Sequence, residues 1–306
     1  MRIATSTIQS MVQNTTGNAY KNYSDLIQKI ASNKNFTKVS EDVMGATKVL
    51  KLNDNIAKMQ EYQSNIKAAM NEMDVAYDVL SEVNDELNTI TALVMDAANA
   101  TTSPDSARAI ATEISERVGT ISDKMNTKYL DSYIFSGSYT QKQAYVMGPD
   151  GAYVYQGSSP EGGDRNLTIS EGVTFAYNFT GEEIFCGADG LGNTKEFFSE
   201  MNELNEILTT EPLDYNKIRE KLNIIRSTQD NIINSTGTIS AKVAKLDSTY
   251  SVNESALNDL IGDKAEIEDL DIAKAATDLA NAQNALQASY AVSSTILNSV
   301  SLLDYI

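Results

Sequence analysis

The stretch IAKAATDLANAQNALQASYAVSSTILNSV, residues 272–300, decides the fold of this chain. Its repeating positions alternate steps of four and three: Ile272, Ala276, Leu279, Gln283, Leu286, Tyr290, Ser293, Leu297 and Val300. Positions that recur about every 3.5 residues lie along one side of a helix, and an apolar stripe of this kind packs against another helix. The stretch therefore predicts a terminal helix that pairs with a second helix.

The same spacing occurs over residues 43–130 and again over residues 214–262. The first region holds one run with Ile66, Met70, Met73, Tyr77 and Leu80, and a second run with Leu87, Ile90, Val94 and Ala97. The alternation of four and three is broken once between these runs, because Tyr77, Leu80 and Val83 are spaced three and three. A third run extends from Ile218 to Leu260 without a slip. We expect these regions to form an antiparallel helical bundle.

Two sequence signals place the helix starts within the first region. Ser40, followed by acidic residues in the first turn, favours a helix start near residue 40. Ser103 and Pro104 have the residue types preferred at the N-cap and at the first helical position, and the apolar stripe that follows extends to Tyr129.

The pattern changes between residues 138 and 195, where apolar and polar residues alternate and glycine is frequent. Residues 144–146 and 153–155 flank a turn-forming stretch, and residues 167–169 and 173–177 flank a second one. Alternation with turn residues between two runs is typical of antiparallel hairpins. We therefore predict a mainly α fold with a small antiparallel β domain inserted into it.

This pattern divides the chain into three predicted domains, because the two ends differ from the bundle in composition. The residue ranges are a terminal helical assembly domain at 1–40 and 265–306, a helical bundle shaft at 41–137 and 196–264, and a β domain at 138–195. The N- and C-terminal segments pair along their length in this prediction, which is the organisation of an assembly subunit more than of an enzyme.

The composition excludes several classes of function. The chain has 24 basic and 42 acidic side chains and a net charge of −18, which disfavours nucleic acids and anionic membranes as partners. It has no histidine and one cysteine, so a Ser-His-Asp triad, an imidazole metal site and an internal disulfide are all excluded. We find no cleavable signal sequence and no apolar run of membrane-spanning length. We expect no metal and no cofactor.

A few motifs are compatible with chemistry but have simpler interpretations. Ser64 and Lys67 have the spacing of a serine nucleophile and its lysine base, yet they lie inside a long amphipathic helix. Gly187, Gly190 and Gly192 precede no Gly-Lys-Ser/Thr sequence, so we interpret them as loop residues. The acidic run at 266–271 is interpreted as a solvated break between helices. We therefore expect no catalytic site.

The two terminal helices are predicted to be the functional surface. The stripe at 5–31 is thin, and the helix at 272–303 is rich in alanine and serine. Two such helices bury little apolar surface and need further partners to be stable. The residues predicted to form this surface, toward other subunits or a chaperone, are Ile8, Met11, Leu26, Ile30, Ile272, Leu279, Leu286, Tyr290, Leu297 and Val300.

Several segments resemble the flagellin superfamily of bacterial flagellar proteins. LANAQNALQASY at 279–290 and SLLDYI at 301–306 are similar to the C-terminus of that family. IASNK at 30–34 with SED at 40–42 resembles its N-terminal connector, although Asn33 and Glu41 depart from the usual glycine and aspartate. YIFSG at 133–137 and parts of 155–185 resemble the members that lie at the junction between hook and filament.

The resemblance implies a structural role outside the cell. It implies export through the flagellar apparatus without a cleaved signal, a cytoplasmic export chaperone on the C-terminal helix, and assembly into a ring. The ring would join the first hook-associated protein to flagellin, and the terminal helices would become ordered on assembly. Two alternatives remain open: a flagellin that forms the filament itself, and another secreted helical assembly protein.

Overall fold

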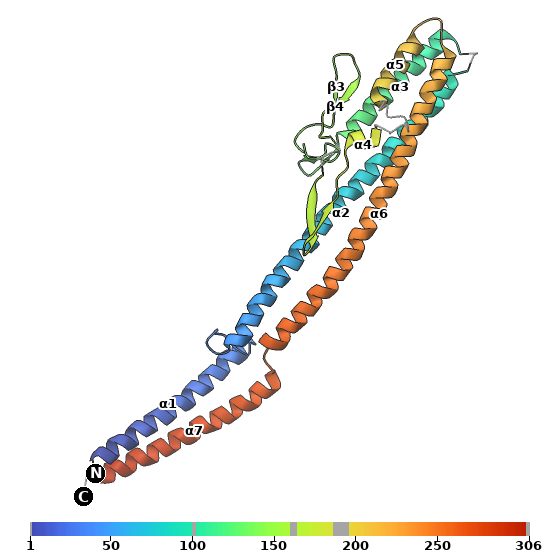
Figure 1. Cartoon of the computed structure of the whole chain (residues 1–306). Helices are drawn as coiled ribbons and strands as arrows, with labels where there is room; N and C mark the ends of the chain where they lie inside the picture. The colour runs from blue at the N-terminus through green and yellow to red at the C-terminus, as the bar shows by residue number, and fades with distance from the viewer. Residues whose placement is uncertain (1, 100–101, 160–163, 186–195, 304–306) are drawn as a thin grey trace. The chain divides into compact units, whose positions relative to one another are not determined.

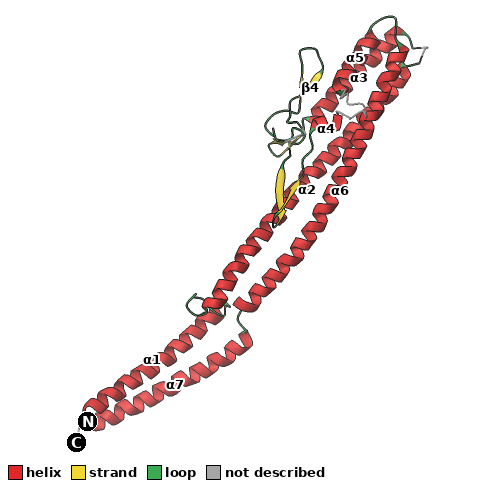
Figure 2. Cartoon of the chain, in the orientation of Figure 1, coloured by secondary structure: helices red, strands yellow, loops and turns green. Residues whose placement is uncertain are grey.

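A computed structural model describes residues 2–99, 102–159, 164–185 and 196–303, with side chains placed for residues 6–296 of these ranges. The chain divides into two compact units, Met1–Met59 with Ser255–Ile306 and Gln60–Glu254. Helices dominate both units, and all of the described strands lie in the second (Figure 2). The mainly α fold with small antiparallel β elements is confirmed, while the division into three domains stays a prediction.

The first unit is built around an antiparallel pair of helices, α1 (Arg2–Ser32) and α7 (Ile272–Leu303) (Figure 1). The hydroxyls of Thr16 and Ser293 lie 2.9 Å apart within the pair. At its other end the backbone N–H of Leu270 donates to the carbonyl of Asn33 over 3.2 Å. The pairing of the two terminal helices that the sequence predicts is therefore present.

Two long helices, α2 (Val43–Ala97) and α6 (Tyr215–Glu268), contribute to both units. The predicted start at Ser40 is wrong, because α2 begins at Val43. The carboxylate of Asp42 accepts a 2.8 Å hydrogen bond from the backbone N–H of Gly45, so Asp42 satisfies one of the free N–H groups of the first turn. At the other end of the bundle, the predicted break at 266–271 begins later, since α6 continues through Glu268.

The core of the second unit lies along α2 and α6. One series of buried positions on α6 recurs every heptad, at Ile218, Ile225, Ile232, Ile239, Leu246 and Asn253, and Lys221 and Thr228 are buried beside it. On α2 one series of buried positions alternates steps of three and four without a break: Ile66, Ala69, Met73, Ala76, Leu80, Val83, Leu87, Ile90, Val94 and Ala97. The predicted slip near Tyr77 is therefore wrong, because the structure buries the small Ala69 and Ala76 and leaves Tyr77 exposed.

A polar contact lies at the edge of this apolar seam. The side-chain amide of Gln229 on α6 donates a 2.9 Å hydrogen bond to Asn88 on α2. The hydroxyl of Thr91 donates to the oxygen of the same Gln229 amide over 3.5 Å. These hydrogen bonds favour one register of α6 against α2.

Two shorter helices complete the helical part of the second unit, α3 (Pro104–Met125) and α5 (Phe197–Thr209). The predicted cap of α3 is confirmed, since the hydroxyl of Ser103 accepts a 3.2 Å hydrogen bond from the N–H of Ser106. The predicted extension of this helix to Tyr129 is wrong. The Asn126 side chain exchanges two hydrogen bonds with the backbone of Tyr145, at 2.8 and 2.9 Å, and these tie the end of α3 to the following strands.

The strands form three separate antiparallel pairs. They are β1 (Lys128–Tyr129) with β2 (Ser132–Tyr133), β3 (Tyr145–Met147) with β4 (Tyr153–Tyr155), and β5 (Asn166–Ser170) with β6 (Val173–Ala176). The two predicted hairpins are confirmed as β3–β4 and β5–β6, and a short helix α4 (Gly181–Phe185) follows them. The β1–β2 hairpin was not predicted.

Aromatic side chains join the β3–β4 hairpin to α5. The ring of Phe198 lies 4.6 Å from that of Tyr145 and 5.6 Å from that of Tyr153, measured between centroids. Phe197 and Phe185 extend the cluster, with ring centroids 5.5 Å apart. Aromatic pairs at such distances contribute beyond the area they bury, so this cluster fixes the hairpin on the helices.

Candidate assembly surfaces

The contact between α1 and α7 mixes small and large side chains, most of which are only half-buried. On α7 the buried and half-buried positions alternate steps of four and three: Ala275, Leu279, Ala282, Leu286, Ser289, Ser293 and Ile296. On α1 the matching half-buried positions are Val12, Thr16, Ala19, Tyr23, Leu26 and Ile30. Because alanine and serine bury little apolar area, the pair has little core of its own to offset the entropy of ordering two helices.

Large apolar side chains remain outside this contact. Met11 is 70% exposed. Further exposed side chains on the two helices are Ile8, Tyr20 and Ile27 on α1 and Ile272, Tyr290 and Val292 on α7. Ile8, Met11 and Val292 of this set line one groove, and clustered apolar surface of this kind is characteristic of an interaction site.

Part of this surface forms a groove between the two helices, with a volume of about 330 Å³. The residues that line it are Ile8, Met11, Val12, Thr15, Ala288, Ser289, Val292, Ser293 and Ile296. None of them carries a charge, so the groove suits apolar side chains such as those on the face of another helix.

The structure separates the predicted interface residues into two groups. Leu26, Ile30, Leu279 and Leu286 lie in the contact between α1 and α7, whereas Ile8, Met11, Ile272 and Tyr290 are exposed. Leu297 and Val300 belong to α7, but their side chains lie outside the described residues. Val292 and Ile296 were missed as groove residues, although Val292 lies two residues after Tyr290 and Ile296 lies one residue before Leu297. That all ten act in assembly stays a prediction.

The other motifs take no part in a recognisable chemical site. Ser64 is exposed, and the ammonium of Lys67 lies 5.0 Å from the centroid of the Tyr250 ring. In the acidic run, the hydrogen bond from the Lys34 ammonium lowers the pKa of Glu268 from its usual value. Cys186, Gly187, Gly190 and Gly192 lie outside the described residues.

The described parts of the chain offer neither a membrane span nor a metal cluster. No helix there is both long and apolar enough to cross a membrane. No group of carboxylate or thiol side chains there is arranged to hold a metal ion. The contact between α1 and α7 and its groove therefore stay the principal candidate surface.

Comparison with known proteins relates the chain to flagellar components. The family model of the bacterial flagellin N-terminal helical region matches residues 3–140. No curated protein matches the chain. A Vibrio parahaemolyticus structure described as a flagellar hook-associated protein is 23% identical, with a TM-score of 0.68 and coverage of 75% of this chain and 100% of that chain.

Two further structures have the same architecture. The flagellar hook associated protein-3 of Legionella pneumophila has a TM-score of 0.63 at 15% identity and covers 72% of this chain and 98% of its own. Bacillus cereus FlgL has a TM-score of 0.56 at 20% identity and covers 70% of this chain and 99% of its own. Residues 3–140 thus match the helical N-terminal region of bacterial flagellin, and 70% to 75% of the chain shares the fold of these hook-associated protein and FlgL structures.

Proposed function

We propose that this chain is a structural, non-enzymatic subunit of the bacterial flagellum that joins the hook to the filament. The observation that carries the proposal is the uncharged groove on the α1–α7 pair, in a chain with the fold of hook-associated protein 3 and FlgL. In this role several copies of the chain form a ring. One side of the ring contacts the first hook-associated protein, and the other side contacts flagellin.

The narrow contact between α1 and α7 supports a particular way of assembling. A helix pair in which only Ala275 and Leu286 are buried among the described side chains is marginal alone and becomes stable when further helices cover Met11 and Tyr290. The same marginal stability suits passage through an export channel in an unfolded state. Export without a cleaved signal, with a cytoplasmic chaperone holding α7, is part of the proposal.

The decisive experiment is localisation of the chain in its own bacterium. Deletion of the gene is expected to leave cells with hooks but without filaments, and such cells do not swim. A tagged full-length chain that restores swimming is expected at a single site between hook and filament. Normal filaments in the deletion strain, or a tag distributed along the filament, contradict the proposal.

A second candidate function, that of flagellin itself, is favoured by the match of residues 3–140 to the flagellin N-terminal region. Self-polymerisation separates the two functions. A flagellin forms long filaments from purified subunits, whereas a junction subunit stays monomeric or forms short assemblies. Electron microscopy of the purified chain under conditions that polymerise flagellin decides between them.

A further inference from the structure

The break between α6 and α7 lies in a stretch that carries no local signal to end a helix. α6 ends at Glu268 and α7 begins at Ile272, while residues 263–280 contain no glycine, proline or asparagine. No residue of the described stretch 269–271 has a positive φ. Helices that end by their own sequence commonly use glycine or asparagine in the left-handed conformation, or a proline shortly beyond. The stretch is therefore compatible with an uninterrupted helix.

The end of α1 shows the contrast. Asn33 has φ +54°, the left-handed conformation that asparagine tolerates. The N–H of Lys34 donates to the carbonyl of Lys29 over 3.2 Å, and that of Asn33 donates to the carbonyl of Ile30 over 3.3 Å. These are the two hydrogen bonds of a Schellman motif. α1 thus ends by its own sequence, whereas α6 needs a contact from elsewhere.

That contact comes from Asn33 and Asn35, in the connector that follows α1. The N–H of Leu270 donates to the carbonyl of Asn33 over 3.2 Å, and the N–H of Asn35 donates to the carbonyl of Glu268 over 2.7 Å. In a continuous helix the Leu270 N–H would bond to the carbonyl four residues earlier, and the Glu268 carbonyl would accept from Ile272. Each connector hydrogen bond therefore takes the place of one helical hydrogen bond across the break.

The charges at the break also depend on the connector. Residues 266–271 are mostly acidic, and the C-terminus of a helix is its negative end, which disfavours carboxylates. The ammonium of Lys34 lies 2.5 Å from the Glu268 carboxylate, and that of Lys264 lies 3.6 Å from it. Without Lys34, the break leaves the acidic run at the negative end of α6 with less compensation. In a continuous helix the same run lies far from either end.

One local contact favours the break. The carboxylate of Asp271 accepts a 3.0 Å hydrogen bond from the N–H of Lys274 and so caps α7. A single cap does not replace the hydrogen bonds that the N–H groups of a new first turn give up. Continuing α6 also needs no new helix nucleus, whereas a separate α7 does. The balance at residues 269–271 therefore rests on the docking of the connector.

We propose that α1 controls where α6 ends. When the connector after α1 is docked, the chain breaks at residues 269–271, and when it is undocked, residues 215–303 form one continuous helix. α7 then becomes a separate helix only after α1 has folded beside it, so the terminal pair forms in a fixed order. The inference goes beyond the proposed function, because it concerns the free chain and needs neither hook nor filament.

The test is backbone nuclear magnetic resonance on the deuterated full-length chain in three forms. In the first, the docked reference, a disulfide holds α1 on α7. The disulfide is made by Thr16→Cys and Ser293→Cys, because the hydroxyls of these two residues lie 2.9 Å apart. Cys186→Ser removes the other cysteine of this form.

The second form, the undocked variant, carries Asn33→Val and Lys34→Glu and has no disulfide. Valine disfavours the left-handed conformation, and the new glutamate repels the Glu268 carboxylate. The third form is the matched control, with Asn33→Gly and Lys21→Glu. Glycine keeps the left-handed conformation, and Lys21→Glu makes the same charge change at an exposed position of α1.

The docked reference is expected to give non-helical Cα chemical shifts at residues 269–271, and the undocked variant is expected to give helical ones. In the variant the amides of Ile272 and Ala273 are expected to exchange with solvent at least about 10-fold more slowly than in the reference. A simple loss of contacts would make this exchange faster. The control is expected to be less helical at 269–271 than the variant, because it keeps the connector contacts. Residues 269–271 that stay non-helical in the variant, or that are helical in the reference, overturn the inference.

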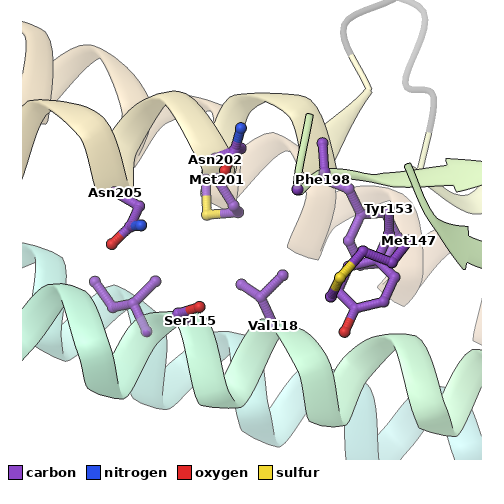
Figure 3. Close-up of a pocket in the computed structure, with 11 residues that line it drawn as sticks. Ser115, Val118, Met147, Tyr153, Phe198, Met201, Asn202 and Asn205 are labelled. Atoms are coloured by element: carbon purple, nitrogen blue, oxygen red, sulfur yellow. The ribbon is translucent and has the colours of Figure 1, made fainter. Parts of the chain in front are cut away.

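Signals from the second unit show whether a variant has kept its fold. Ser115 on α3 and Asn205 on α5 face each other across a pocket of about 70 Å³ (Figure 3), so their amide shifts report on the packing of these two helices. These shifts are expected to be the same in all three proteins. If the double substitution disturbs them, Lys34→Glu alone takes its place, with the same expected change at residues 269–271.

Discussion

The side-chain amide of Asn253 donates a 2.9 Å hydrogen bond to the backbone carbonyl of Ile169. Asn253 is 3% exposed and occupies a seam position of α6 at which its heptad neighbours are apolar. The side-chain amide of Asn65 on α2 donates a similar hydrogen bond, of 3.0 Å, to the backbone carbonyl of Thr168. The β5–β6 hairpin is thus held by one asparagine from each long helix.

Replacing Asn253 by alanine is expected to destabilise the chain by about 1–3 kcal/mol, because the carbonyl of the buried Ile169 loses its partner away from water. Urea unfolding followed by circular dichroism measures the change. Asn223→Ala, at an exposed position of the same helix, serves as the control and is expected to change stability by less than about 0.5 kcal/mol. Equal effects of the two substitutions contradict this account.

The ion pair between Glu72 and Arg165 gives a prediction on pH. The guanidinium of Arg165 lies 2.5 Å from the Glu72 carboxylate and 4.8 Å from the ring centroid of Tyr177, the other titratable group that interacts with this carboxylate. Burial raises the pKa of Glu72 above its ordinary value of 4.5, against the opposing effect of Arg165. The folded chain therefore binds the proton more tightly than the unfolded chain.

It follows that the contribution of this carboxyl to stability is fully present below pH 4.5 and is lost as the pH rises through the raised pKa. Glu72→Gln removes the titration. Urea unfolding of both proteins at a series of pH values from about 4 to about 8 is expected to show the original chain losing stability relative to the variant as the pH rises. Two parallel curves would contradict the assignment.

The buried ammonium of Lys221 on α6 binds two carboxylates of α5, those of Glu200 and Glu203. Lys221→Met removes the ammonium that neutralises the buried Glu200, and breaking a buried pair in this way costs about 3–5 kcal/mol. The double substitution with Glu200→Leu is expected to recover much of the loss, since Glu203 is 59% exposed and stays hydrated. Thermal unfolding of the three proteins checks the order, and a double variant less stable than Lys221→Met is inconsistent with it.

The exposed and buried residues of the terminal helix pair are expected to have different roles. Met11→Glu should leave the pair of α1 and α7 intact but prevent incorporation into the flagellum, because it places a charge in the groove. Gln28→Glu adds the same charge at an exposed polar position of α1 and should be incorporated normally. Swimming and filament counts after complementation measure incorporation, and normal filaments with Met11→Glu would remove the groove from the interface.

Leu286→Asp tests the contact within the pair. Leu286 is the large side chain most buried between the helices, at 8% exposed, and a carboxylate there has no cation to pair with among the seam residues. The variant is expected to keep the cooperative unfolding of residues 60–254 but to lose filaments. Loss of that unfolding transition would show that the effect is not confined to the terminal pair.

Limited proteolysis tests the marginal stability of the ends. Residues 1–40 and 265–306 of the purified monomer are expected to be digested first, because the α1–α7 contact buries few large side chains. Mass spectrometry of the resistant fragment identifies its ends. Resistance of both ends in a confirmed monomer would contradict folding on assembly.

The heptad pattern predicted the long helices well, but it misplaced the packed face wherever small and large residues competed. On α7 the large Ile272 and Tyr290 were assigned to the seam, whereas Ala275 and Ser289 lie in it. On α2 Tyr77 was likewise assigned to the packed face, whereas the structure buries Ala76 and exposes Tyr77. Small residues allow close approach of two helices, so size alone does not identify the packed face of an amphipathic helix.

The exposed surfaces were harder to predict than the core. The turn at Leu130 follows Tyr129 directly, so an apolar stripe appeared to continue where the chain actually reverses. The groove beside Met11 depends on how α1 and α7 are rotated against each other, and a single sequence does not specify that rotation. The capped start of α3 was predictable because Ser103 and Pro104 act locally.

The hydrogen bonds of Gln229 with Asn88 and Thr91 also fix the axial register of α6 against α2, on which the two anchors of the β5–β6 hairpin depend. If α6 slid along α2 by one heptad, its apolar residues would still meet apolar residues, but every position would move by about 10 Å. Asn253 would then lie far from Ile169 while Asn65 stayed in place, and the hairpin could no longer reach both of its anchors. A single glutamine in the middle of α6 thus helps to set the spacing between Asn65 and Asn253, and with it the attachment of a distant hairpin.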